Sequence, residues 1–248
     1  SWQLIWSGDN LARYLIIDPE NPDILYLSTG IFDREAFNSD CENAVPGGTG
    51  VLKSTDGGLT WNPINKGLTD LYVGALRMHP DDPAILFAAA GNIACSGGHT
   101  GHTSGGLFKT TNGGAHWKKV ISNDDMTTVN FSFSNPYIMY AGSGVAFYKS
   151  IDQGNTWVRY AKKNGYQWGP PGIIAGIPID VVVDPKNPHL LYSNNYGGGV
   201  FRSRDGSATW ESWSKGYSGA ELHDVYISSK AASKVYVIGR SGPFMSAD

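Results

Sequence analysis

The chain has 248 residues, of which 41% are hydrophobic and 17% are charged, and its formal net charge is −3. This length and apolar content suffice for a sizeable core. The weak, scattered charge argues against nucleic acid or an anionic membrane as a partner. No apolar run approaches the roughly 18 residues that cross a membrane. We therefore expect no membrane insertion, and no motif calls for a cofactor.

The first predicted strands flank a nine-residue turn motif, Asp18-Pro-Glu-Asn-Pro-Asp-Ile-Leu-Tyr26. The motif returns at residues 79–87, 132–140, 184–192 and, in degenerate form, 228–236. Proline and asparagine favour a turn, and the residue before a proline is restricted to extended conformations. We expect one strand before each copy, as at residues 15–17, and a second at its apolar tail, as at residues 25–27.

A second motif follows each turn motif, beginning with Ser54-Thr-Asp-Gly-Gly-Leu-Thr-Trp61. It recurs at residues 110–117, 150–157 and 203–210, and a fifth copy begins at Ser246. Asp or Asn side chains hydrogen-bond the backbone two residues on and close a tight turn, while glycine supplies a positive φ. The tryptophan starts the next strand. The structural residues of these turns are therefore Asp56, Asn112, Asp152, Asp205 and Asp248.

Each unit thus contains four predicted strands, with a period typical of repeat architectures. Four-stranded antiparallel units that repeat radially are propeller blades. We predict an all-β, five-bladed β-propeller that forms one domain over residues 1–248. The last unit lacks its fourth strand, and residues 1–8 match residues 60–67, which hold that strand in the first unit. We expect the N-terminal strand to complete the last blade, unless the chain was cut from a larger propeller.

The second motif resembles the Asp-box, or bacterial neuraminidase repeat, of β-propellers. These proteins include sialidases, xyloglucan-active glycoside hydrolases, sortilin-type receptors and the photosystem II assembly propeller. The pairing of the two motifs is most similar to the xyloglucan-active enzymes. The resemblance covers essentially the whole chain and implies the propeller fold and an extracellular or cell-surface protein. In these families the Asp-box is a structural turn remote from the active site.

Three insertions, at residues 31–49, 92–105 and 163–172, fall on the face opposite the Asp-boxes, and long loops on a rigid scaffold often carry function. Cys41 and Cys95 lie in neighbouring insertions, which predicts a disulfide; the alternative is two unpaired thiols. A weaker alternative is a metal site formed by Cys95, His99 and His102, whose spacing offers three ligands in one loop.

The strands that precede the turn motifs line the predicted central channel. Aligning them places Asp180 and Asp224 at one level on adjacent blades. Two facing carboxylates are what glycoside hydrolysis needs, one protonated and one ionised. The alternative is that these polar groups only satisfy strand ends in a wet channel. The candidate ligand-binding side chains around them are Tyr14, Arg77, Tyr166, Trp168, Tyr196 and His223.

Three functions are compatible with these residues. The first is an extracellular recognition module for a carbohydrate or protein ligand on the loop face, without catalysis of its own. The second is a glycoside hydrolase that uses Asp180 and Asp224, and the third is a protein assembly scaffold. A hydrolase predicts an open pocket at the two carboxylates. A lectin predicts exposed rings at Trp168 and Tyr196, and a scaffold predicts a broad apolar patch.

Overall fold

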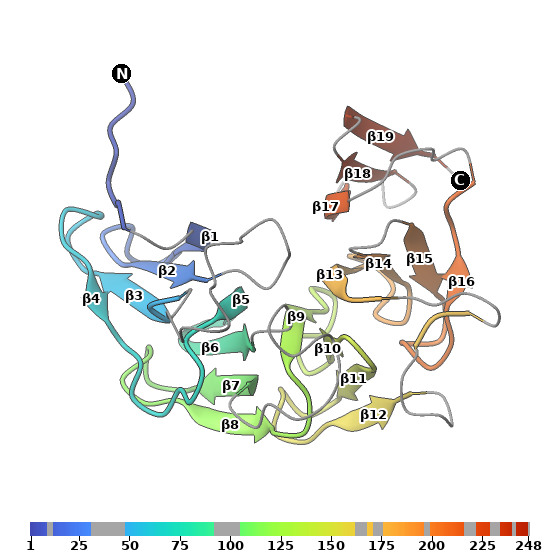
Figure 1. The fold of residues 1–248 in the computed structure, drawn as a ribbon, viewed down its shortest axis with the longest axis horizontal. Helices are drawn as coiled ribbons and strands as arrows, with labels where there is room; N and C mark the ends of the chain where they lie inside the picture. Colours follow the sequence, from blue (N-terminus) through green and yellow to red (C-terminus); the bar gives the residue numbers. More distant parts are fainter. Residues whose placement is uncertain are drawn as a thin grey trace, which may run out of the picture. The chain divides into compact units, whose positions relative to one another are not determined.

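The structure is a computed structural model of the 248-residue chain. It describes residues 1–8, 12–30, 48–91, 105–161, 168–170, 176–195, 199–215, 222–228, 234–239 and 242–247. The described residues form nineteen strands in five antiparallel sheets (Figure 1). The prediction of an all-β, five-bladed β-propeller is confirmed. Within the described residues, no helix has the length and apolar character needed to cross a membrane.

The chain forms two compact units, residues Ser1–Met126 and Thr127–Asp248. Unit 1 holds the first two blades. Blade 1 consists of β1 (Ala12–Ile17), β2 (Leu25–Thr29), β3 (Val51–Ser54) and β4 (Asn62–Pro63). Blade 2 consists of β5 (Val73–His79), β6 (Asp82–Ala90), β7 (Gly106–Thr110) and β8 (Lys118–Ile121). In both blades the last strand begins directly after the Asp-box tryptophan, as the repeats predict.

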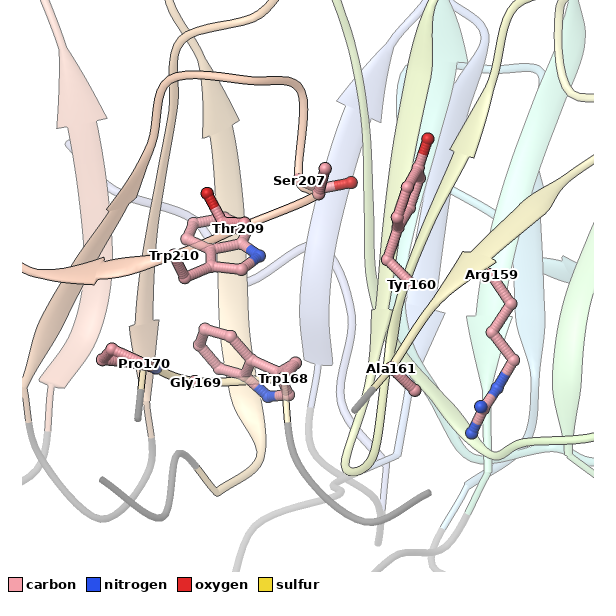
Figure 2. A pocket seen from close by; sticks show the side chains of 10 residues that line it. Arg159, Tyr160, Ala161, Trp168, Gly169, Pro170, Ser207, Thr209 and Trp210 are labelled. Carbon is pink, nitrogen blue, oxygen red and sulfur yellow. The ribbon is translucent and has the colours of Figure 1, made fainter. Parts of the chain in front are cut away.

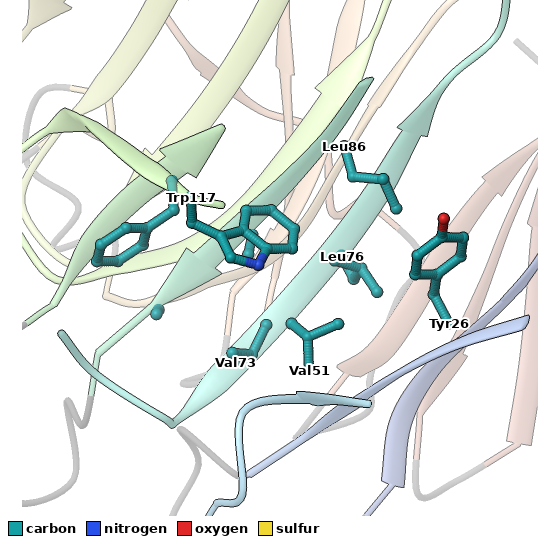
Figure 3. Close-up of a cluster of buried hydrophobic side chains, with 9 residues drawn as sticks. Tyr26, Val51, Val73, Leu76, Leu86 and Trp117 are labelled. Atoms are coloured by element: carbon teal, nitrogen blue, oxygen red, sulfur yellow. The ribbon is translucent and has the colours of Figure 1, made fainter. Parts of the chain in front are cut away.

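The core of unit 1 lies where blades 1 and 2 pack against each other. Tyr26 and Val51 from blade 1 meet Leu76, Leu86 and Trp117 from blade 2, and each is at most 2% exposed. Figure 3 shows these side chains gathered in one cluster. The alternating apolar residues of the strands therefore pack face to face between the two sheets.

Unit 2 holds the other three blades, and its first strand begins at the unit boundary. Blade 3 consists of β9 (Met126–Phe131), β10 (Met139–Ser143), β11 (Phe147–Ser150) and β12 (Val158–Tyr160). Blade 4 consists of β13 (Pro178–Val183), β14 (Leu191–Asn195), β15 (Val200–Ser203) and β16 (Glu211–Ser212). Blade 5 consists of β17 (Leu222–Ile227), β18 (Val235–Gly239) and β19 (Gly242–Ser246).

Two clusters form the core of unit 2. The first joins blades 3 and 4 through large rings, among them Tyr140, Phe147, Trp168 and Trp210. The second joins blades 4 and 5 through Tyr192 and the valines of β17 and β18. The cluster between blades 3 and 4 is therefore mainly aromatic, whereas the cluster between blades 4 and 5 is mainly aliphatic.

Blade 5 has three strands, with β19 at its edge. Residues 1–8 form no strand, and Trp2 and Leu4 are exposed. Closure of the last blade by the N-terminal strand thus stays a prediction. The N-terminal segment does contact blade 1, because the indole Nε1–H of Trp61 donates to the Ile5 carbonyl at 2.9 Å.

Candidate functional site

Each described Asp-box folds by hydrogen bonds within its own eight residues. In blade 1, Asp56 Oδ1 accepts from the Ser54 hydroxyl at 2.7 Å and from the Thr60 N–H at 2.9 Å. Its Oδ2 accepts from the Thr60 hydroxyl at 2.6 Å. Ser54 Oγ in turn accepts the Gly58 N–H at 2.8 Å. Hydrogen bonds from Thr60 and Ser54 lower the pKa of Asp56 to about 2.

The other copies repeat this pattern. Asp152 and Asp205 accept the same threonine and serine bonds in blades 3 and 4. Burial raises the pKa of Asp152, but the hydrogen bonds from Thr156 and Ser150 outweigh it and lower the pKa to about 2. Asn112 plays the same part in blade 2, where it accepts the His116 N–H at 3.0 Å. Turn formation thus occupies these side chains in all four described copies.

Blade 4 departs from the other copies at the second position after the aspartate. That position is glycine in the first three Asp-boxes, with positive φ at Gly58, Gly114 and Gly154. In blade 4 it is Ser207, whose φ is 73°. An L-residue other than glycine is disfavoured in this region. Ser207 is 1% exposed, and its hydroxyl has no hydrogen-bond partner among the described residues.

The Asp-box tryptophan of blade 4 also differs from its counterparts. The indole N–H of Trp61 donates to the Ile5 and Gly58 carbonyls, that of Trp117 to the Ile64 carbonyl, and that of Trp157 to the Gly154 carbonyl. Trp210 is 6% exposed, and its Nε1–H meets no acceptor within the described part of the chain. A buried, unsatisfied donor is uncommon in native proteins.

The two residues that carry these unsatisfied groups, Ser207 and Trp210, line one pocket of about 310 Å³ between blades 3 and 4 of unit 2. The pocket is bounded by Arg159 and Tyr160 at the end of β12, by Trp168 and Pro170, and by the Asp-box of blade 4. Figure 2 shows the Trp210 nitrogen and the Ser207 oxygen on the side of the pocket that faces Tyr160. This volume lies at the lower end of the range for small-molecule sites.

Trp168 also lines this pocket, lies below Trp210 in Figure 2, and is 5% exposed. Its Nε1–H donates to the Gly176 carbonyl at 3.0 Å. Its ring packs edge-on against Phe147 at 4.7 Å and Trp210 at 5.2 Å between ring centroids. The exposed ring that a lectin predicts at this position is therefore not observed, because Trp168 folds inward onto the core and offers only its pocket side.

The first predicted carboxylate, Asp180, lies on β13 and is 4% exposed. Its Oδ1 accepts the Thr128 hydroxyl from β9 at 3.0 Å and the Val181 N–H at 2.8 Å. The Asp180 backbone is held as well, because its N–H donates to Asn194 Oδ1 and its carbonyl accepts from Ser193. The Asp180 carboxylate thus binds blade 3 to blade 4.

The second predicted carboxylate, Asp224, lies on β17, which packs beside β13. It is partly buried. Its Oδ1 accepts the Val225 N–H at 2.8 Å, and its Oδ2 accepts the Tyr226 hydroxyl. The structure therefore places the two aspartates on neighbouring strands of adjacent blades, as predicted from the alignment, with each one hydrogen-bonded.

Tyr14 and Arg77 meet in unit 1, on the inner strands β1 and β5. The Arg77 guanidinium carbon lies 4.3 Å from the centre of the Tyr14 ring, a cation–π contact. One guanidinium nitrogen of Arg77 donates to the Leu76 carbonyl at 3.1 Å. These two predicted ligand-binding residues form a pair with each other.

The remaining predicted site residues fall elsewhere. His223 is part of β17, but its side chain is not among those described. Outside the described residues lie Tyr166, Tyr196, the Cys41–Cys95 disulfide, the metal candidates Cys95, His99 and His102, and the last Asp-box residue, Asp248. The prediction missed Ser207, Trp210 and Tyr160. One feature of the sequence could have indicated this site, because Ser207 stands where the first three Asp-boxes have glycine.

A comparison with known proteins relates the chain to a carbohydrate-active enzyme. A xyloglucanase of Hypocrea jecorina (strain QM6a) is 30% identical to it over 162 residues. The match covers 64% of this chain and 16% of that enzyme, so the chain spans about a sixth of the enzyme's length. No family model matches the chain.

Solved structures share the fold at lower identity. An ancestral GH74 enzyme superposes with a TM-score of 0.64 and 19% identity, over 91% of this chain and 27% of that one. YCF48, solved bound to a D1 peptide, superposes with a TM-score of 0.52 and 13% identity, over 93% of this chain and 67% of that one. At these identities the likeness concerns the fold alone.

Proposed function

Because this chain is a β-propeller related to the GH74 xyloglucanases and to YCF48, we propose that it is a recognition module for an extracellular ligand, carbohydrate or protein, without catalysis of its own. Among its relatives, one is named for a glycan and another is solved with a peptide. Both ligand classes are therefore compatible with this fold. The extracellular location is part of this proposal, and its support is the family resemblance alone.

The pocket between blades 3 and 4 is the observation that carries this proposal. It combines aromatic walls with two buried polar groups, the Trp210 N–H and the Ser207 hydroxyl, that have no partner among the described residues. A buried polar group without a partner costs about 1–3 kcal/mol. A bound ligand that supplied acceptors would recover this free energy, which is how a pocket of this kind selects what it binds.

A glycoside hydrolase that uses Asp180 and Asp224 is the second candidate, and its support is the relation to the xyloglucanase and the adjacent placement of the two carboxylates. Hydrolysis needs a proton donor that can reach the glycosidic oxygen. Asp180 is instead buried and bonded to Thr128 and the Val181 N–H. We therefore place recognition ahead of catalysis.

The test is binding to glycan and peptide arrays, with reducing-end detection on every glycan hit. Arg159 lines the pocket from an exposed position, so Arg159→Ala is expected to weaken binding. Arg204→Ala is the matched control, because Arg204 is an exposed arginine outside the pocket that pairs with Glu211. Release of reducing ends that Asp224→Asn abolishes would replace the proposal with the hydrolase. Absence of any array hit would favour an assembly scaffold.

We also propose that residues 1–8 supply the fourth strand of blade 5. The support is that Trp61 donates to the Ile5 carbonyl as Trp117 donates to the Ile64 carbonyl, which directly follows β4. Ile5 thus contacts the Asp-box of blade 1 in the way that Ile64, directly after the fourth strand of blade 1, contacts the Asp-box of blade 2. Oxidation of cysteine pairs placed between residues 3–5 and 243–245, read by gel mobility, is expected to cross-link one register. Lack of any cross-link would contradict the closure.

A further inference from the structure

Two Asp-boxes of unit 1 are contacted by another part of the chain in the same way. At the seam of blades 1 and 2, Trp117 donates to the Ile64 carbonyl at 2.7 Å. The Ile64 side chain fills the space beside the Asp-box, since a Cβ at Gly114 would lie 2.2 Å from Ile64 Cδ1. The Ile5 segment repeats this arrangement at Trp61 and Gly58, where a Cβ would lie 3.1 Å from Ile5 Cδ1. In both cases a segment from outside the Asp-box supplies an apolar side chain and a backbone carbonyl.

At the seam between blades 3 and 4, no carbonyl of the described residues accepts the Trp210 N–H. Tyr160 stands three residues after its Asp-box tryptophan, the position that Ile64 has in blade 1. No bond joins it to Trp210 in the described residues, and the pocket lies in the space beside the turn. Ser207 replaces the glycine, and its side chain has room there. The pocket therefore occupies the position at which the Ile5 and Ile64 segments contact the Asp-boxes of blades 1 and 2.

We propose that this pocket binds an extended peptide segment of a partner protein, whose backbone carbonyl accepts the Trp210 N–H and whose apolar side chain enters between Trp168 and Tyr160. The proposal rests on the recognition function above and names the ligand of the same site. The partner segment completes the seam as the Ile5 and Ile64 segments complete theirs. Ser207 provides a second hydrogen bond at the pocket wall.

The chemistry of the lining favours a peptide. The indole N–H can only donate, so it requires an acceptor such as a peptide carbonyl. No carboxylate is among the described residues that line the pocket, and the Thr209 hydroxyl already donates to Asp205 at 2.6 Å. Pro170 and three aromatic rings supply apolar walls, which resemble in kind the aromatic grooves that take proline-rich extended peptides. A sugar with many hydroxyl groups would need several hydrogen-bond acceptors, and few of the described lining side chains can accept.

The experiment screens a displayed library of linear peptides against the full chain and measures synthetic hits by isothermal titration calorimetry. Trp210→Phe keeps most of the ring packing but removes the N–H, so it is expected to weaken peptide binding about tenfold. Trp157→Phe is the matched control, because Trp157 is an Asp-box tryptophan outside the pocket, and it should leave binding unchanged. Ser207→Gly should weaken binding less than Trp210→Phe while raising the melting temperature.

A thioamide scan of the peptide then locates the acceptor. One carbonyl replaced by a weaker C=S acceptor should reduce binding to the wild type and have no further effect on Trp210→Phe. Ser207→Gly keeps the proposal testable if Trp210→Phe does not fold. Peptide hits that neither variant affects would overturn the proposal. Glycan hits that depend on Trp210, without peptide hits, would overturn it and leave the recognition function standing, whereas absence of both would overturn both.

Discussion

Replacing Ser207 by glycine is expected to stabilise the fold while it weakens ligand binding. Ser207 has a φ of 73° and is 1% exposed, and its hydroxyl is unsatisfied within the described residues. Glycine adopts this backbone conformation without strain and would also remove the hydroxyl. Both contributions favour the variant in the folded state.

The size of the effect follows from three terms. Relief of the left-handed conformation contributes about 1–2 kcal/mol, and removal of a buried, unsatisfied hydroxyl about 1–3 kcal/mol. The greater freedom of glycine in the unfolded chain opposes them by about 0.4–1 kcal/mol. The net stabilisation is at least about 1 kcal/mol, which for a chain of this size raises the melting temperature by about 2 °C or more.

The assay is thermal unfolding followed by circular dichroism at neutral pH. The control is the opposite exchange, Gly114→Ser, at the equivalent position of blade 2. It should lower the melting temperature, because φ is +88° there and the new Cβ would lie 2.2 Å from Ile64 Cδ1. An unchanged or lower melting temperature for Ser207→Gly would show that the hydroxyl has a stabilising partner. The unsatisfied group would then no longer support a ligand site.

Three further predictions concern residues of the turns and the inner strands. The folded-state pKa of Asp152 is about 2, below the ordinary 3.8, so its contribution to stability is complete above about pH 4 and lost as the pH falls toward 2. Asp152→Asn should therefore lower the melting temperature at neutral pH and flatten its decline over that acid range in thermal melts. Asp180→Ala should destabilise the chain by about 1–3 kcal/mol in urea unfolding, because it removes the acceptor of the Thr128 hydroxyl and leaves that donor unsatisfied. The loss should be smaller in a Thr128→Val background, because the two residues share one bond; additive losses would contradict this. Trp117→Phe should cost about 1–3 kcal/mol beyond the lost ring volume, because it leaves the Ile64 carbonyl without its donor. A loss in urea unfolding no larger than that of Trp157→Phe would contradict this.

The blades could be predicted from the sequence because their determinants are local. The Asp-box bonds join residues two to four apart, such as Ser54, Asp56 and Thr60. A repeated eight-residue pattern therefore carries all the information that the turn needs. The position of the flanking strands follows, because each turn fixes where one strand ends and the next begins.

The candidate site could be predicted only in part. The alignment of inner strands placed Asp180 and Asp224 on adjacent blades, but it could not reveal that Thr128 from β9 donates to Asp180. Trp168 was expected in an exposed loop, yet its ring packs into a cluster with Phe147 and Trp210. These contacts join residues more than twenty positions apart, and neither spacing nor composition encodes them.

The pocket itself arises from a departure from the repeat. Ser207 at a glycine position is visible in the aligned sequence, and it indicates that something differs at that turn. The missing partner of Trp210 is not visible there, because it depends on where the end of β12 lies relative to the Asp-box of blade 4. In a repeat protein, the recurring residues thus indicate the fold, and the residues that depart from the repeat indicate candidate binding sites.

The self-contained Asp-box also has a consequence for the order of folding. Closing a loop of a few residues loses little chain entropy and takes well under a microsecond. The four described turns can therefore form in the unfolded chain before any pairing between blades. Each turn brings its two flanking strands into register, so hairpin formation starts at the Asp-boxes and spreads inward. Synthesis from the N-terminus would then let blade 1 assemble while the later blades are still being made.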